Sequence, residues 1–218
     1  MRDLRPLTVD RVPDLAGDFA LCTFWQTVPH NGHVLARAPE EVLRDWVHEV
    51  TADWGPPGRI AYVDGMPAGN VLLAPARHVP RLAAFPTAPS DPSTLMLLTV
   101  RVNADQQGRG LRKVLVQAAV KEALRHRVRA IDVIAARPLA VSRHPCVLEA
   151  AFLENVGFRV TRDHPVYPRL RLDLRTVVTV REEAAAAVRK VLAKVPGLRP
   201  VPDTRPDGVT PARTAHRP

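Results

Sequence analysis

The pattern of apolar and polar positions is clearest near the middle of the chain, where two different periodicities follow each other. Residues 95–102 (LMLLTVRV) are almost continuously apolar, which is typical of a central strand buried on both faces. Residues 111–125 instead place apolar side chains at helical spacing. Two glycines lie in the residues between these segments. The pattern therefore predicts a buried strand, a glycine-containing loop and an amphipathic helix in direct succession.

The flanking sequence predicts a mixed α/β fold. Apolar runs bounded by turn residues predict further strands at residues 4–9, 59–63, 69–74, 130–135 and 166–174, with a turn at Asp64-Gly65. Helical spacing and capping residues predict helices at residues 12–26, from Pro39 onward, at 146–156 and at 179–195. We expect one domain at residues 1–178, with the 179–195 helix packed on it. The Pro- and Arg-rich residues 196–218 hold few large apolar groups, so we expect a disordered tail.

Charge and cysteine content narrow the class of protein. The 218 residues are 46 % apolar and 24 % charged, which is ordinary for a soluble globular protein. A formal net charge of +9 favours a phosphate-rich ligand, RNA or an anionic surface, or alternatively a solvated basic surface with no partner. We interpret the two cysteines as reduced thiols, and we expect no metal site because their spacing is not that of zinc ligands. Without a signal segment or an apolar run of ~20 residues, we expect a cytoplasmic protein with no membrane partner.

The glycine-containing loop DQQGRG carries the most specific chemistry. The first turn of a helix presents unpaired N–H groups and the positive end of the helix dipole, which together bind anions. Gly108 and Gly110 let the backbone approach a phosphate without an intervening Cβ. Arg109, Arg112 and Lys113 add positive charge at the same place. The loop therefore predicts a phosphate site, although it matches neither a Walker A loop nor a Rossmann fingerprint.

Residues Gln107 to Arg112 (QGRGLR) resemble the acetyl-CoA motif of the GNAT superfamily of N-acetyltransferases, [QR]-x-x-G-x-[GA]. The segment AAFLENVGF at residues 150–158 resembles the end of the family's fourth helix, and the hairpin IAYVDGMPAGNVLLAP resembles its second and third strands. The resemblance covers residues 3–175 and is to a branch of actinobacterial type with no assigned substrate. It implies the GNAT fold, a central mixed and mostly antiparallel sheet flanked by helices, with splayed central strands.

The resemblance also implies a donor and a reaction. Acetyl-CoA would be the cofactor, and a small-molecule amine would attack its acyl carbonyl directly, with no covalent enzyme intermediate. The residues that the resemblance assigns to acetyl-CoA are Val100, Arg101, Val102, Gln107, Gly108, Arg109, Gly110, Leu111, Arg112 and Lys113. Arg112 stands where the family has Gly or Ala, so its side chain either adds charge for the pyrophosphate or crowds it.

The sequence departs from the family at the residues that usually transfer protons. Leu153 occupies the place of a tyrosine that protonates the departing thiolate, and leucine has no proton to donate. Cys146, which stands where many members have asparagine, is a candidate acid or alternatively a small buried thiol. His144 is a second candidate acid or a surface histidine, and Asp132 is the candidate base on the strand after the predicted helix. Orientation of the reactants alone also suffices in some members.

Candidates for the acceptor pocket lie near the predicted first helix. Trp25, His30 and His33 either line this pocket or are one core residue and two loop residues. Two other functions stay open: an aminoacyltransferase of GNAT fold that takes its donor group from charged tRNA, and a non-catalytic module that binds coenzyme A. The altered glycine motif, the absent tyrosine and the positive charge favour the tRNA alternative. Many family members dimerise, so a homodimer is an open alternative to a monomer.

Overall fold

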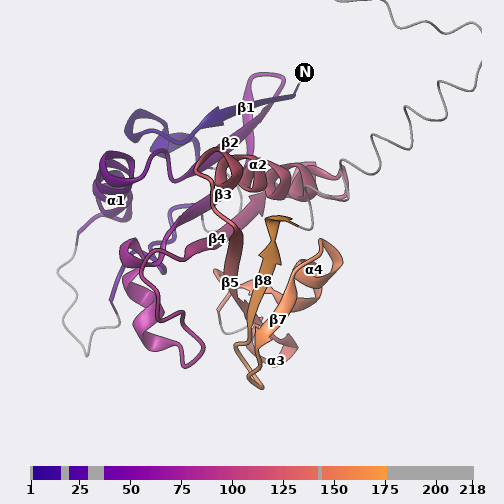
Figure 1. Ribbon diagram of the computed structural model, residues 1–218. Helices are drawn as coiled ribbons and strands as arrows, with labels where there is room; N and C mark the ends of the chain where they lie inside the picture. Colours follow the sequence, from indigo (N-terminus) through magenta and orange to yellow (C-terminus); the bar gives the residue numbers. More distant parts are fainter. Residues whose placement is uncertain (1, 16–19, 29–36, 142–143, 176–218) are drawn as a thin grey trace, which may run out of the picture. The chain divides into compact units, whose positions relative to one another are not determined.

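A mixed, mostly antiparallel sheet forms the centre of the described structure, a computed structural model (Figure 1). The structure describes residues 2–15, 20–28, 37–141 and 144–175. The sheet has eight strands within these ranges, in the order β1-β2-β3-β4-β5-β8-β7 with β6 paired to β5. They are β1 (Arg2–Pro6), β2 (Gly58–Val63), β3 (Met66–Pro75), β4 (Leu95–Val102), β5 (Ala130–Ala136), β6 (Leu148–Glu149), β7 (Arg159–Arg162) and β8 (Arg169–Asp173).

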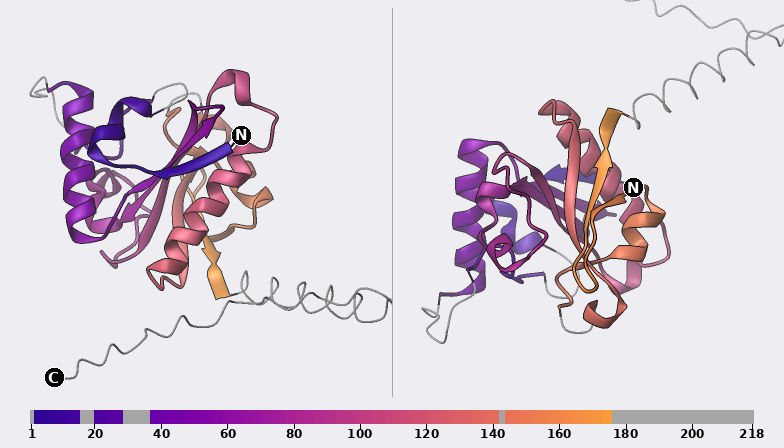
Figure 2. Two further views of the ribbon diagram at one scale, coloured as in Figure 1. Left: turned by 90° about the horizontal axis from the view of Figure 1, so that it is seen from above. Right: turned by 60° about the horizontal axis from the view of Figure 1, so that its bottom comes forward.

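Helices cover both faces of this sheet. The α1 helix (Pro39–Asp53) lies on one face, and α2 (Leu111–Arg125) and α4 (Ala150–Asn155) lie on the other (Figure 2). Each face has its own apolar core, because α1 packs against one set of strand side chains and α2 with α4 against the alternate set. The shorter helical turns are η1 (Val9–Asp14), η2 (Ala76–His78), η3 (Pro80–Ala84), η4 (Ala104–Gln106) and α3 (Pro138–Val141). No helix in the described ranges is both long and apolar enough to span a membrane.

The central strand and helix have the bounds that the sequence predicts. β4 covers Leu95–Val102 and is buried along nearly its whole length, and α2 covers Leu111–Arg125. The predicted hairpin is also confirmed: β2 pairs antiparallel with β3, and the turn residues Asp64 and Gly65 have positive φ angles of 50° and 83°.

Other predicted elements are wrong or shifted. The helix expected at residues 12–26 is replaced by η1 and by turns at residues 20–28, and Pro13 lies inside η1. Residues 20–28 are instead tied to a distant segment, by the Cys22–Cys146 disulfide and by the hydrogen bond from Trp25 Nε1 to the carbonyl oxygen of Cys146, and these contacts replace the local helical spacing. The strand expected at 4–9 is β1, which begins and ends earlier. The helix expected at 146–156 is the shorter α4, because residues 148–149 pair with β5 instead.

The chain divides into two compact units, Met1–Val178 and Thr179–Pro218. The helix expected at 179–195 and the tail expected at 196–218 lie outside the described residues.

The strands β4 and β5 diverge, and this divergence positions the site. They are parallel neighbours, but a single register pair, Met96 with Asp132, joins them. From that point the rest of β4 runs apart from β5, whose far end pairs with β6 through Ala135 and Leu148. One edge of β4 near its C-terminal end is therefore not covered by a ladder to β5.

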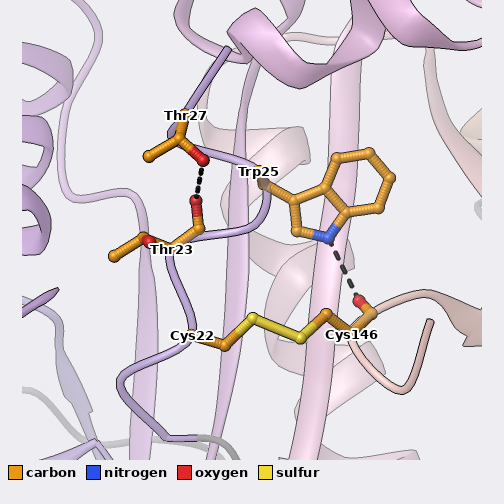
Figure 3. The surroundings of a disulfide bond; sticks show 5 residues. All are labelled: Cys22, Thr23, Trp25, Thr27 and Cys146. Atoms are coloured by element: carbon orange, nitrogen blue, oxygen red, sulfur yellow. Dashed lines mark hydrogen bonds between the residues drawn. A yellow bond between two sulfur atoms is a disulfide. The ribbon is translucent and has the colours of Figure 1, made fainter. Parts of the chain in front are cut away.

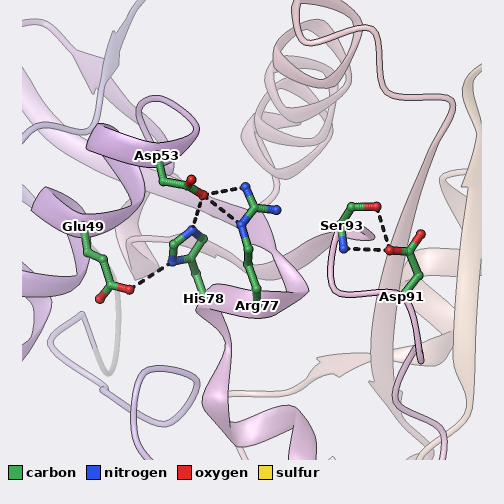
Figure 4. Close-up of polar contacts among 6 residues, drawn as sticks. All are labelled: Glu49, Asp53, Arg77, His78, Asp91 and Ser93. Carbon is green, nitrogen blue, oxygen red and sulfur yellow. Dashed lines mark hydrogen bonds and ion pairs between the residues drawn. The ribbon is translucent and has the colours of Figure 1, made fainter.

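An ionic cluster fastens the end of α1 to η2 (Figure 4). The imidazole of His78 lies between two carboxylates, with Nε2 at 2.6 Å from Asp53 Oδ2 and Nδ1 at 3.3 Å from Glu49 Oε1. Arg77 donates a second hydrogen bond, from Nε to Asp53 Oδ2 at 2.8 Å. These hydrogen bonds, from His78 first and Arg77 second, hold the pKa of Asp53 below its ordinary value.

Candidate functional site

The loop between β4 and α2 forms a cradle of backbone amides. Gly110 stands at the start of α2 in the left-handed region with φ 76°, and no side chain caps the helix. Gly108 has a similar φ of 74°, and a Cβ placed on either glycine would meet nothing within 4 Å. The first N–H groups of a helix have no partner within the helix. An uncapped helix start that faces open space therefore fits an anionic group, as the sequence predicts.

A groove of about 750 Å³ begins at this cradle and follows the free edge of β4. Val100, Arg101 and Val102 form one side of it. Pro145, Glu149 and Phe152 form the opposite side. The groove thus occupies the gap that opens where β4 and β5 diverge, with the phosphate cradle at its end near α2.

The groove continues into a smaller chamber of about 230 Å³ further back along β4. The two cavities share five lining residues: Val100, Arg101, Arg112, Pro145 and Glu149. The chamber adds Thr99, Val141, Cys146, Val147 and Leu148 to these. A long ligand with its phosphates at the cradle would therefore place its other end in the chamber.

Arg112 stands at the junction of groove and chamber. Its guanidinium lies over the ring of Phe152, with Cζ at 3.8 Å from the ring centroid, which is a favourable cation–π distance. Burial lowers the pKa of Arg112, and the nearby Glu149 carboxylate acts in the opposite direction. An arginine stays charged under such a shift. The side chain lies against Phe152 of α4 and forms part of the lining of both cavities.

Nine of the ten residues assigned to acetyl-CoA from the sequence line the groove. Arg109 is the exception, since its carbonyl oxygen accepts a hydrogen bond from Arg2 Nη2 at 3.2 Å and the residue does not line the cavity. The sequence analysis missed Gln106, Pro145, Glu149 and Phe152, which also line it. Helical spacing could not have found Glu149 and Phe152 together, because Glu149 belongs to β6 and only Phe152 to α4.

The two cysteines form a disulfide with each other, contrary to the expectation of reduced thiols (Figure 3). Cys146 lines the chamber, but a disulfide sulfur carries no proton. Cys146 therefore has no proton to give as an acid in this form, and would regain one only on reduction. The bond joins residues 20–28 to the wall of the chamber.

Trp25 and His144 lie beside this disulfide in an aromatic cluster. The indole Nε1 of Trp25 donates a hydrogen bond to the carbonyl oxygen of Cys146 at 3.2 Å (Figure 3). Trp25 is buried and stacks on Phe85 at a centroid distance of 5.6 Å. The His144 ring is half-buried and lies 5.8 Å from the ring of Tyr167. Neither residue lines the groove or the chamber, so the cluster supports the chamber wall from behind.

Asp132 is fully buried on β5 and is held by arginines. Its Oδ1 accepts from Arg171 Nε at 2.6 Å, its Oδ2 accepts from Arg171 Nη2 at 3.0 Å, and Arg169 Nε lies at 3.6 Å. The strands β5 and β8 are joined by these contacts, and Asp132 lines neither cavity. The remaining acceptor candidates, His30 and His33, lie outside the described residues. In the described part of the chain no group of three or more metal-ligating side chains comes together.

No protein-family model matches the sequence, and no curated protein matches it. Solved structures do match its fold. YncA of Salmonella typhimurium with its cofactor acetyl-CoA is 17 % identical with a TM-score of 0.54, and the match covers 80 % of this chain and 94 % of that one. The PaiA N-acetyltransferase of Thermoplasma acidophilum in complex with coenzyme A is 12 % identical with a TM-score of 0.51, covering 79 % and 99 %.

A third match is the loading GNATL domain of CurA from Lyngbya majuscula. It is 16 % identical with a TM-score of 0.51, and the match covers 81 % of this chain and 99 % of that chain. Structural similarity at this level of sequence identity shows that the chains share a fold. The chain has the fold of the GNAT acetyltransferases, as the resemblance in its glycine loop implies.

Proposed function

We propose that this chain is an N-acyltransferase that moves an acyl group from an acyl-CoA thioester to a small amine by direct attack. One observation carries the proposal: the uncapped start of α2, flanked by two positive-φ glycines, opens onto a groove that follows the free edge of β4 into a chamber. Bound acyl-CoA would supply an acyl group that its thioester activates towards amines. The solved structures of PaiA and YncA, which hold coenzyme A and acetyl-CoA, have the same fold and support this choice of donor.

The chain's own groups fit such a donor along its length. The backbone N–H groups at Gly108 to Arg112 and the ammonium of Lys113 would hold the pyrophosphate. The edge of β4 at Val100 to Val102, which has no ladder partner on β5, would offer its backbone groups to the pantetheine arm. Two separate features of the fold, the helix start and the splayed strand, thereby fix the two ends of one ligand.

The residues around the chamber would act on charge and protons. Arg101 and Arg112 place positive charge where negative charge develops during acyl transfer. Glu149 is the one carboxylate among the described residues that line both cavities, and we assign it the acceptance of the amine proton through water. Holding the amine and the thioester in reactive orientation would supply the larger share of the decrease in activation free energy, roughly 7–11 kcal/mol.

Several finer points rest on the sequence alone. The actinobacterial-type branch, the cytoplasmic location, the homodimer and a small-molecule amine as the acceptor are predictions. The disulfide argues against the predicted cytoplasmic location, because disulfides persist mainly in oxidising compartments. A charged-tRNA donor is the alternative to acyl-CoA, with affinity that would fall steeply as salt concentration rises.

A pair of glycine variants tests the donor site. Gly110 and Gly65 have similar positive φ angles of 76° and 83°, and both face open space, but Gly110 lines the groove and Gly65 does not. An alanine at either position meets a similar strain of about 1–2 kcal/mol in the left-handed region. If the cradle relaxes to relieve this strain, ligand binding must restore it, so we expect Gly110→Ala to weaken coenzyme A binding about tenfold.

Isothermal calorimetry with coenzyme A and acetyl-CoA measures this effect, with ATP as a control ligand. We expect Gly65→Ala to bind as the wild type does. Equal affinities for all three proteins would contradict the cradle, and no binding to any of them would remove the acyl-CoA donor. In the latter case, turnover with charged tRNA would establish the alternative donor. Binding without acyl transfer to a panel of primary amines would leave a non-catalytic module.

A further inference from the structure

The polar lining of the chamber exceeds what a simple acetyl group needs. The chamber volume of about 230 Å³ has room for roughly seven waters at ~30 Å³ each, whereas an acetyl group has three heavy atoms. Its lining includes two guanidinium groups, from Arg101 and Arg112, and one carboxylate, from Glu149. The charged lining is therefore net positive at the end of the groove where the reaction would occur.

Thr99 supplies an independent observation that points to a ligand. The residue is 4 % exposed, it lines the chamber, and its Oγ1 has no hydrogen-bond partner among the described residues. Buried hydroxyl groups in folded proteins nearly always have a hydrogen-bond partner, because leaving a buried hydroxyl without a hydrogen bond is unfavourable. Thr99 belongs to the chamber lining and its Oγ1 has almost no accessible surface, so a side-chain rotation that turns the hydroxyl towards the chamber would give it a ligand as its partner.

The position of Thr99 follows from a bulge in β4. The register with β3 shifts between Leu72 and Leu73, which pair with Thr99 and Leu97 respectively. The shift leaves Leu98 as the extra residue of β4, and a bulge of this kind re-aims the side chains that follow it. Arg101, two residues further along β4, is on the same face of the strand as Thr99 and also lines the chamber.

A hydroxyl donor together with guanidinium groups complements a carboxylate. Guanidinium N–H groups bind carboxylates with paired, charge-assisted hydrogen bonds, and a threonine hydroxyl adds one more donor. Arg112 is held in place for this by its contact with Phe152. A neutral alkyl group in the same space would leave the Thr99 hydroxyl without a partner, so the lining disfavours it.

We propose that the chamber binds a carboxylate-bearing part of a substrate, held by Thr99, Arg101 and Arg112. This inference rests on the proposed acyltransferase function and names its substrate class. The carboxylate has two sources: the acyl group of a dicarboxylic acyl-CoA, or the α-carboxylate of an amino-acid acceptor. Both put the same chemistry in the same chamber.

Two arms of one kinetic experiment separate the sources. In the donor arm, succinyl-CoA is compared with butyryl-CoA, whose acyl chain has the same length and no carboxylate. In the acceptor arm, amino acids are compared with the matching amino-acid amides, with acetyl-CoA as donor. We expect the carboxylate-bearing member to have a kcat/KM roughly 10- to 100-fold higher in one of the two arms, as for hydrogen bonds to a charged group.

Variants show whether the chamber is responsible. We expect Thr99→Val to lower this preference severalfold and Arg112→Gln to abolish it, while Thr99→Val leaves kcat/KM for the uncharged member unchanged. A general loss of structure would lower both members equally, so the ratio isolates recognition. Turnover without preference in either arm would overturn the inference and leave the proposed function standing, as would a preference that neither variant changes. If calorimetry shows no coenzyme A binding, the proposed function and this inference fall together.

Discussion

Reduction of the Cys22–Cys146 disulfide should cost the protein a large part of its stability. The bond closes a loop with a sequence separation of 124 residues, which spans α1, most of the sheet and α2. In the chain-entropy description, a loop of this length restricts the unfolded state by about 4.9 kcal/mol at 25 °C. For a chain of this size, such a change corresponds to a fall in Tm of about 10–20 °C.

Urea unfolding with and without a dithiol reductant measures this loss. The protein is purified without reductant, and alkylation followed by mass spectrometry counts its free thiols. The double variant Cys22→Ser/Cys146→Ser is the control, and its unfolding should match that of the reduced wild type and should not respond to reductant. Two free thiols in the untreated protein would refute the disulfide, and an unchanged midpoint on reduction would refute its contribution to stability.

The two single variants extend the same prediction to activity. Cys22→Ser and Cys146→Ser remove the same cross-link, so we expect equal losses of stability. They differ in the chamber, because Cys22→Ser leaves a thiol on Cys146, which lines the chamber, and Cys146→Ser does not. A higher kcat for Cys22→Ser would support the predicted role of Cys146 as an acid. Equal kcat values would mean that the thiol has no such role.

Three further predictions concern carboxylates. Asp132→Asn should lower the free energy of unfolding by about 1–3 kcal/mol, because it weakens the charge-assisted hydrogen bonds that the buried carboxylate accepts from the partly exposed Arg171; an unchanged free energy in a urea titration would contradict this. The pKa of Asp53 is held below its ordinary value of 3.8, mainly by His78, so its stabilisation is present above that pH and is lost as the pH falls through the lower folded value. Asp53→Asn should therefore lose less stability than the wild type in urea titrations across this acid range. Glu149→Gln should lower kcat about 100-fold at neutral pH, whereas Glu154→Gln in α4, the helix that follows Glu149, is outside both cavities and should not change it.

Elements whose apolar pattern is local were predictable from the sequence. β4 is buried on both faces and α2 has an apolar stripe bounded by Gly110, so each has its signal within its own residues. β7 (Arg159–Arg162) was missed because all four of its residues are exposed, and strand pairing with β8 defines it without an apolar alternation. The segment at 12–26 shows the opposite failure, in which helical spacing is present but the contacts of Cys22 and Trp25 with Cys146 determine the structure.

The candidate site likewise has one part that was predictable from local sequence and one part that was not. The cradle at Gly108 and Gly110 depends on backbone angles that glycine itself permits, so a short motif was enough to find it. The chamber depends on residues from β4, from the start of α2 and from the segment between α3 and α4, which no local pattern connects. Thr99 in particular has no sequence signal, because its significance is the absence of a partner in the folded chain.

The cradle and the chamber should differ in which part of a ligand they select. The cradle would bind through backbone groups and would accept any ligand with a suitably placed pyrophosphate, so it would select the pyrophosphate-bearing carrier and not the group attached to it. The chamber would bind through side chains, and its wall at residues 145–149 is joined to residues 20–28 by the disulfide and by the Trp25 indole. A change in residues 20–28 can therefore move the chamber wall while the cradle stays in place. Selection of the transferred group and of the acceptor should follow the segments at 20–28 and 144–149, and affinity for the carrier should follow the loop before α2.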